Sequence, residues 1–390
     1  MRSEKIFIGG WYQRTMLHLS EIYDFLKDAS SPLNLNAKKL KDLRKRLDIE
    51  SMEMKMGDFE YIEIIASGGI KVKIFEDGLI VLNTDYNNAK EDIFKLTTFY
   101  EKKLSPAISY LFSLGAPVPK ELANIKTVYP YFIVLKDAET EAINILLKEF
   151  NQGKYFEIKK NEFEIYRGDK LYIINNVSEK SETIEKIINE QIFVREFKGQ
   201  LHRYLNLHRI IWEKIADIKE RGEIQGKEAG IFKSQIESYK KTINLIEARI
   251  NQMGSYIGTR GAIVKNDPEL QKIIDVLKFK YDTLGDTLSY IKEIWSMTKN
   301  YLDSSQQIFN NIQAESTSGS INSLTIITSA GVAASLIKLL DQKMPEIKLD
   351  GVIYFLILAF VGYCVNKIMK TVTARKKYKI NDIEIAKNIK

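Results

Sequence analysis

The feature that most constrains this chain of 390 residues is an almost unbroken apolar run near its C-terminus. Residues 352–365 read VIYFLILAFVGYCV, apolar apart from two tyrosine hydroxyls. With its flanks, the segment 351–369 approaches the roughly 20 residues that a helix needs to cross a bilayer. Lys367 fits this segment because its long side chain can reach the headgroups. The sequence therefore predicts a transmembrane helix.

A second, weaker candidate precedes it. Residues 321–340 read INSLTIITSAGVAASLIKLL and carry no charge before Lys338. Their small and hydroxyl-bearing side chains suit a helix that packs against other helices or lines water. The two segments predict a transmembrane hairpin over 321–370, with a turn at 341–350 that contains Pro345. The alternative is a single membrane anchor preceded by a buried soluble helix.

The net charge of +7 is concentrated in the tail. From residue 366 onward, eight basic side chains face two acidic ones, a local balance of +6. Basic residues beside an apolar segment indicate the cytoplasmic side and attraction to anionic lipid. We expect a multi-pass protein of the cell (inner or plasma) membrane with both termini cytoplasmic, residues 371–390 as a basic tail, and no nucleic acid as partner. The first 18 residues lack the apolar core of a signal peptide.

Residues 1–177 predict a cytoplasmic α+β domain of mixed strands and helices. Strand patterns occupy 59–65, 70–75, 79–83, 128–135, 155–160, 162–166 and 170–176, and helical patterns occupy 90–114 and 138–150. Residues 73–83 and 164–176 resemble each other as hairpins that precede a helix. That likeness indicates either a duplicated unit or two ordinary hairpins.

Residues 178–320 predict a long helical hairpin and a coiled-coil stalk, interrupted near 221–230 and at 254–266. A third helix is predicted to begin with Asp267 as N-cap and Pro268 at the first position, and to run unbroken into the first membrane segment. Its apolar seam follows a heptad repeat through Ile274, Leu277, Tyr281, Leu284, Leu288, Ile291, Trp295, Thr298 and Leu302, continued by Ser305, Phe309 and Ile312. Such a seam needs partner helices from its own chain, from other copies, or from both.

Motifs of enzyme chemistry are missing from the sequence. It has three histidines, one cysteine, and no H-E-x-x-H, C-x-x-C or Walker motif. We expect no enzyme and no covalent cofactor, and read the glycine-rich stretch 254–261 as a flexible helical corner. A cytoplasmic ligand site in residues 2–176 is possible, but the sequence does not locate it.

Two short motifs resemble those of the CorA family of magnesium and divalent-cation transporters. The first predicted membrane helix contains LTIIT at 324–328, and the turn contains Met344, Pro345 and Glu346, similar to the MPEL segment of that family. The resemblance implies a CorA-like homopentameric funnel in the lipid bilayer, with the first membrane helix of five subunits lining a pore. Mg²⁺ or another divalent cation would be its substrate or regulator.

One departure from the family concerns ion selectivity. The Gly-Met-Asn motif that precedes MPEL in the family is missing, and residues 338–343, KLLDQK, stand in its place. In the family that motif binds hydrated magnesium at the pore mouth. The chain is therefore similar to a divergent member that lacks the family's magnesium-binding motif. Asp341, Met344, Pro345 and Glu346 form the predicted pore-mouth loop.

Two faces of the first membrane helix are candidates to line the pore. The phase of the stalk heptad favours the inner seam Leu324, Thr328, Gly331 and Ser335, whereas the other polar face carries Asn322, Thr325 and Ser329. Both faces could instead be helix contacts.

Three functions remain open from the sequence. The first is a CorA-like membrane channel or transporter for divalent cations, gated through the cytoplasmic domain. The second, implied by CorA-like branches encoded beside type III CRISPR systems, is a membrane effector of antiviral defence opened by a nucleotide ligand. The third is a non-conducting, membrane-tethered coiled-coil scaffold.

Overall fold

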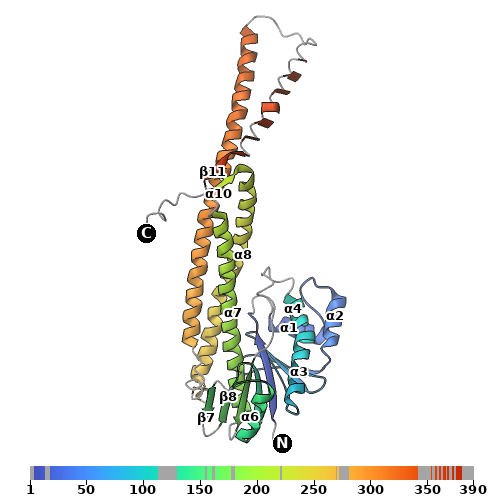
Figure 1. The fold of residues 1–390 in the computed structure, drawn as a ribbon. Helices are drawn as coiled ribbons and strands as arrows, with labels where there is room; N and C mark the ends of the chain where they lie inside the picture. Colours follow the sequence, from blue (N-terminus) through green and yellow to red (C-terminus); the bar gives the residue numbers. More distant parts are fainter. Residues whose placement is uncertain are drawn as a thin grey trace, which may run out of the picture. The chain divides into compact units, whose positions relative to one another are not determined.

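The protein combines an α+β domain with long helices in a computed structural model (Figure 1). The structure describes residues 4–13, 18–112, 130–153, 156–159, 163–176, 181–219, 222–268, 270–271 and 281–340, with individual residues between 353 and 379. Two compact units are formed by Met1–Leu205 with Leu245–Glu293, and by Asn206–Asn244 with Ile294–Lys390. The first unit therefore joins the N-terminal domain to parts of the later helices. The predicted boundaries of the domains stay predictions.

A nine-stranded sheet forms the centre of the first unit, in the order β2-β3-β4-β5-β1-β6-β9-β8-β7. Its strands are β1 Lys5–Trp11, β2 Ile49–Lys55, β3 Tyr61–Ala66, β4 Ile70–Phe75, β5 Leu79–Asp85, β6 Tyr131–Lys136, β7 Phe156–Lys159, β8 Phe163–Arg167 and β9 Leu171–Asn176. Every strand pair is antiparallel except β6 and β9. The seven predicted strands are confirmed as β3 to β9, whereas β1 and β2 were not predicted.

The two predicted hairpins occupy comparable places in the sheet. The hairpin β4–β5 returns beside β1, the hairpin β8–β9 returns beside β6, and each is followed by a helix. However, β5 is antiparallel to β1 while β9 is parallel to β6. The directions differ because the antiparallel run that returns to the starting strand has four strands in one half, β2 to β5, and three in the other, β7 to β9. Duplication stays a prediction.

Strand β1 is buried on both faces because helices cover the sheet on both sides. Ile6 and Ile8 join the core beneath the helices α1 Leu19–Asp28, α2 Ala37–Arg46, α3 Ala89–Phe99, α4 Ser105–Phe112 and α6 Thr140–Glu149. On the opposite face, Trp11 packs against Phe193 and Phe197 of the helix α7 Ser181–Lys219, with ring centroids 5.6 and 5.4 Å apart. The predicted helix at 90–114 corresponds to α3 and α4, joined by the π-helical turn η1 Tyr100–Leu104.

Three long helices follow, namely α7 Ser181–Lys219, α8 Gly226–Asn266 and α10 Tyr281–Leu340. The predicted break near 221–230 is confirmed, since Gly222 has φ +68° and immediately precedes the short strand β10 Glu223–Gln225. That strand pairs with β11 Lys377–Lys379. The predicted break at 254–266 is wrong, because α8 continues through its glycines to Asn266.

The predicted helix start at Asp267 is confirmed. Its carboxylate accepts a hydrogen bond from the backbone N–H of Leu270 at 3.2 Å, as an N-cap does. Residues 269 and 272–280 lie outside the described part of the chain. Whether one helix connects Asp267 to α10 therefore stays a prediction, as does the burial of Ile274 and Leu277.

The heptad seam of α10 is confirmed from residue 281 onward. All ten seam residues between Tyr281 and Ile312 are only 0–7% exposed. The polar members Thr298 and Ser305 donate their hydroxyls to the carbonyls four residues earlier, both at 2.8 Å, which satisfies them within an apolar seam. In the second unit, Phe309 packs on Phe232 of α8, with ring centroids 6.1 Å apart. Partner helices for the seam therefore come from the same chain.

The predicted first membrane segment is helical, as the final part of α10. Only scattered residues of the second segment are described, and the turn at 341–350 is not. Across the described residues, none of the helices combines the length and the apolar character that crossing a membrane requires.

Candidate functional site

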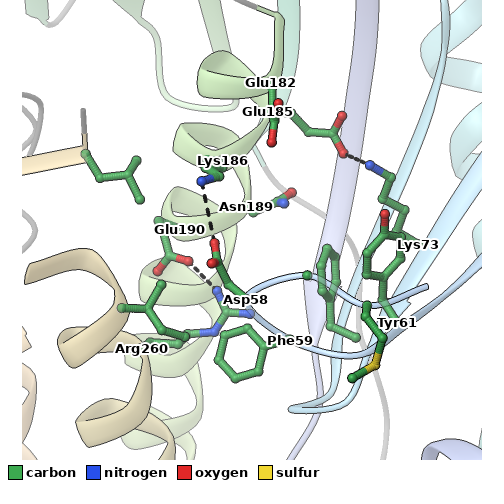
Figure 2. A pocket seen from close by; sticks show the side chains of 15 residues that line it. Asp58, Phe59, Tyr61, Lys73, Glu182, Glu185, Lys186, Asn189, Glu190 and Arg260 are labelled. Atoms are coloured by element: carbon green, nitrogen blue, oxygen red, sulfur yellow. Dashed lines mark hydrogen bonds and ion pairs between the residues drawn. The ribbon is translucent and has the colours of Figure 1, made fainter. Parts of the chain in front are cut away.

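A cavity of about 320 Å³ lies within the first unit (Figure 2). One wall is formed by residues 56–61, which lead from β2 into β3, and by β4. The other wall is formed by the first three turns of α7 and by Arg260 and Ile263 of α8. Segments distant in the sequence meet here because α7 and α8 pack beside the sheet.

A buried arginine is the chemical centre of this cavity. Arg260 is 2% exposed, and its Nε and Nη1 atoms bond the carboxylates of Asp77 and Glu190, each at 2.5 Å. Its guanidinium also lies over the rings of Phe193 and Phe59, 4.5 and 4.9 Å from the centroids. Planar guanidinium suits this combination of forked hydrogen bonding and stacking.

The turn between β4 and β5 holds Asp77 in place. Gly78 has φ +92°, and a Cβ atom there would lie 2.1 Å from the carbonyl oxygen of Tyr12. A side chain at residue 78 is therefore excluded. The Trp11 indole donates to the Asp77 carbonyl at 2.9 Å. Glycine at residue 78 thus allows the turn to lie close to Tyr12, and this placement directs the Asp77 carboxylate to Arg260.

Burial and pairing shift the proton affinities of this cluster. Burial acts to lower the pKa of Arg260, but the carboxylates of Glu190 and Asp77 outweigh it and raise that pKa above its ordinary value. The Tyr281 hydroxyl donates to Glu190, and its pKa is raised by burial and then by the Glu190 charge. Arginine and tyrosine therefore both keep their protons at neutral pH.

Ion pairs at the rim neutralise the remaining cations. Lys73 of β4 pairs with Glu185 of α7. Lys186 lies 2.9 Å from Asp267 and 3.6 Å from Asp58. Among the described residues, the cavity is lined by three basic side chains (Lys73, Lys186, Arg260) and four acidic ones (Asp58, Glu182, Glu185, Glu190), a balance of −1. The described lining therefore has no excess positive charge.

Two buried polar atoms in the lining are unsatisfied. Among the described residues, neither Nη2 of Arg260 nor Oδ1 of Asn189 has a hydrogen-bond partner. Buried polar atoms are normally paired, so each exception requires an explanation. Both atoms belong to residues that line the cavity, and both are themselves shielded from contact.

The predicted pore-lining residues lie on α10, far along the chain from this cavity. Thr325, Thr328 and Ser329 are exposed, and Gly331 is half-buried. The hydroxyls of Thr325 and Thr328 donate at 3.0 Å to backbone carbonyls of their own helix. The side chains of three further candidates lie outside the described part, namely Asn322, Leu324 and Ser335. Which face lines a pore stays a prediction.

The predicted pore-mouth loop also lies outside the described residues, since Asp341, Met344, Pro345 and Glu346 fall within 341–350. Within the described residues, no group of three or more His, Cys, Asp or Glu side chains could hold a metal ion. His208 contacts the Thr298 hydroxyl at 2.6 Å in the second unit. It therefore takes part in helix packing there.

Sequence reasoning did not find the cavity. It placed a possible ligand site in residues 2–176, whereas Asn189, Glu190 and Arg260 come from the helices. Arg260 lies inside the stretch that was misread as a flexible corner. The available signal was a lone arginine at a seam-like position of a long helix, and its acidic partners could not be identified from sequence.

Comparisons with known proteins give little further information. No family model matches the chain, and no curated protein matches it. Among solved structures it is similar to the soluble domain of CorA from Methanocaldococcus jannaschii. The identity is 10%, the match covers 48% of this chain and 88% of that chain, and the TM-score is 0.25. A score this low does not establish a common fold.

Proposed function

We propose that this protein is a CorA-like membrane channel or transporter for divalent cations. One observation carries its membrane part, namely a set of ten large apolar side chains that are 47–66% exposed in the single chain. They are Ile321, Val332, Ile353, Leu356, Ile357, Phe360, Val361, Tyr363, Ile368 and Val372.

Apolar side chains concentrated in this way are costly in water. Monomeric soluble proteins rarely expose large contiguous apolar patches, and such patches indicate contact with a membrane or another protein. The basic cluster at 367–379 follows this segment directly. Lipid hydrocarbon beside a basic, headgroup-facing tail accounts for both features together.

The channel part of the proposal rests on the resemblance in the sequence. LTIIT at 324–328 and Met344-Pro345-Glu346 match the family at both ends of its pore helix. We propose that five copies bring α10 together around the pore and that the cytoplasmic unit gates it. Asp341 and Glu346 would concentrate cations at the mouth, in place of the missing Gly-Met-Asn.

The single cysteine provides a direct test of membrane insertion. Cys364 lies within the apolar segment and is free. The full chain, reconstituted in liposomes, would be labelled with bimane and exposed to lipids brominated on their acyl chains. We expect strong quenching at Cys364. The control variant, Cys364→Ser with Ser255→Cys, carries its label at an exposed position of α8 and should escape quenching. Equal quenching at both positions, or none at Cys364, would refute insertion.

Flux measurements test the transport function. Liposomes loaded with a magnesium-sensitive dye should report entry of Mg²⁺ or Co²⁺ through the reconstituted protein. The variants Asp341→Asn and Glu346→Gln should reduce this flux, whereas Asp286→Asn, at an exposed position of α10, should not. Mass determination of the solubilised complex should give five subunits. Absence of flux together with another subunit number would favour the non-conducting scaffold.

A ligand-opened effector is the second candidate. It is favoured by the cavity of about 320 Å³, because a cavity of that size can hold a small molecule. Its assignment to type III CRISPR defence stays a prediction from sequence resemblance. Flux that requires an added ligand, and not magnesium alone, would support this function over simple transport.

A further inference from the structure

A two-stranded sheet joins the turn between α7 and α8 to the C-terminal tail (Figure 1). Its strands, β10 and β11, have three residues each and run antiparallel, with Ile224 opposite Tyr378. The Gly226 N–H extends the ladder by donating to the Lys376 carbonyl at 3.0 Å. All of these residues belong to the second unit. The backbone therefore links the turn directly to the chain that follows the predicted second membrane segment.

Local contacts hold β10 in place between the two helices. Gly222 precedes the strand with φ +68°, a conformation that glycine adopts without steric cost. After the strand, the Glu228 carboxylate accepts a hydrogen bond from the Gln225 N–H at 3.0 Å, in the manner of a helix cap at the start of α8. The strand thus presents an edge of backbone groups that need partners. In the described part of the chain, β11 pairs with that edge.

Buried side chains stabilise this short sheet. Two strands by themselves are at best marginally stable in water. Here the opposite residues Ile224 and Tyr378 are only 2% and 6% exposed. Burial of an isoleucine and a tyrosine side chain is favourable because both are largely apolar. The contact between turn and tail therefore depends mainly on this buried pair.

Two ion pairs lie beside the buried pair. Lys377 lies 3.2 Å from Glu223 of β10, and Lys376 lies 2.6 Å from Glu315 of α10. Their side chains are 48–69% exposed, so each pair contributes little to stability. They show, however, that the tail contacts two elements at once. Glu315 precedes the predicted first membrane segment, so the tail meets both the turn and the approach to that segment.

We propose that β10 and β11 form a clasp, a releasable contact that makes the turn between α7 and α8 and the C-terminal tail open and close together. Release requires little local unfolding, because the sheet is short and its ion pairs are exposed. A displacement of the turn is transmitted to the tail, and the reverse also holds, because coupling between two sites is reciprocal. The clasp consists of contacts within the chain, so failure of the flux measurements leaves it standing.

An engineered disulfide tests whether the clasp forms within one chain. Gln225 and Lys377 lie opposite each other, next to a hydrogen-bonded pair. Such positions bring Cα atoms to about 4.5 Å, within disulfide range. In a Cys364→Ser background, Gln225→Cys with Lys377→Cys should oxidise to an intramolecular disulfide, identified by mass spectrometry. Gln225→Cys with Thr371→Cys, at an exposed position before the strand, should not.

The pattern of cross-linking decides the first part of the proposal. Absence of a disulfide at the opposite pair would overturn the clasp. So would a disulfide that links two chains, or equal oxidation of the opposite pair and the control pair.

Amide hydrogen exchange of the full chain in detergent measures the coupling. Tyr378→Ala, in the tail, should make the Gly226 amide exchange at least tenfold faster. Ile224→Ala, in the turn, should accelerate exchange of the Lys376 amide to a similar extent. Tyr290→Ala, at a position of α10 that is 58% exposed, is the matched control and should change neither amide. Unchanged exchange of β1 verifies that each variant is folded.

The two buried substitutions act from opposite sides of the clasp. An effect confined to the segment that carries the substitution would contradict the coupling, as would unchanged exchange in both variants. The oxidised disulfide variant should show the reverse effect, with slower exchange on both sides, and reduction should restore the original rates.

Discussion

Two stretches of the helical region differ in the burial of their apolar side chains. From Tyr281 to Ile312, the seam of α10 is 0–7% exposed. From Ile321 to Val372, ten large apolar side chains are 47–66% exposed. The upstream stretch carries its apolar residues mainly along one seam, whereas residues 352–365 are almost entirely apolar. The two stretches also differ in the supply of partner surface.

The upstream seam finds its partners in the same chain. Phe309 packs on Phe232, and Lys240 pairs with Asp303 at 2.7 Å beside the seam. The downstream side chains have no comparable cover among the described residues. Burial of apolar surface is the main favourable term in folding, and the exposed downstream surface is where the proposed membrane contact would supply it.

Matched phenylalanines give the largest expected contrast. Phe309→Ala removes a ring that is 1% exposed and should reduce the free energy of unfolding by about 3–5 kcal/mol. Phe360→Ala removes a ring that is 66% exposed and should change it by less than about 0.5 kcal/mol. Denaturant titration of the detergent-solubilised chain measures both. Equal losses would show that Phe360 is packed in an oligomer, which would break the comparison.

Arg260 should contribute to the free energy of unfolding about as much as Phe309 does, but through its charge. Arg260→Met leaves Asp77 and Glu190 buried without their cation, and we expect a loss of about 3–4 kcal/mol in unfolding free energy. Arg209→Met, at an exposed position of α7, is the matched control and should be near neutral. Adding Asp77→Asn and Glu190→Gln to the Arg260 variant should recover part of the loss. No recovery would indicate that packing, and not charge, is responsible.

A buried glutamate on α7 predicts a pH dependence of the first unit. Burial, opposed by Arg203 and Arg195, raises the pKa of Glu196 to about 7 from an ordinary value of 4.5. The folded protein thus holds a proton that the unfolded chain releases above pH 4.5. This contribution to stability is full below pH 4.5 and is lost as the pH rises to about 7.

Thermal unfolding between pH 4.5 and 8 measures this effect. We expect Glu196 to account for a decrease of about 2–3 kcal/mol over that range. Glu196→Gln cannot ionise, so its stability curve should lack this decrease and lie above that of the unmodified protein at pH 8. Parallel curves for the two proteins would contradict the raised pKa.

The smallest expected effect concerns the cap at Asp267. Asp267→Ala removes the bond to the Leu270 N–H and should cost about 1 kcal/mol of unfolding free energy. Asp267→Asn keeps a capping oxygen but loses the charge that pairs with Lys186. We expect the asparagine variant to retain most of the stability. A similar loss in both variants would assign the effect to the ion pair.

The sequence predicted seven strands because their alternation and turn residues are local properties. It did not reveal β1, although this strand lies in the middle of the sheet. The reason is Gly9, which weakens the alternating pattern by which a strand is predicted from sequence. A Cβ atom there would lie 2.7 Å from both Ile192 Cδ1 and the Ile80 carbonyl oxygen. Glycine is therefore required by contacts with segments that are distant in the chain.

Helix boundaries likewise divide into those set by nearby residues and those set by contacts with distant segments. The N-cap at Asp267 was predictable since it involves residues three apart. The continuation of α8 through 254–266 was not predictable from the sequence. Each glycine disfavours a helix by only about 1 kcal/mol, and packing can outweigh that cost. The seam of α10 was predictable from its heptad spacing alone, but the identity of its partners was not.

The candidate site is almost entirely a product of the tertiary structure. Arg260 meets Asp77 across 183 residues and Glu190 across 70 residues. By itself, the sequence determined the periodic features, namely the strands, the seam, the cap, the apolar segment and the basic tail, since each depends on neighbours within one or two turns. Only the tertiary structure decided which side chains are paired, which apolar surface is covered and where a cavity remains, because these depend on contacts between distant segments.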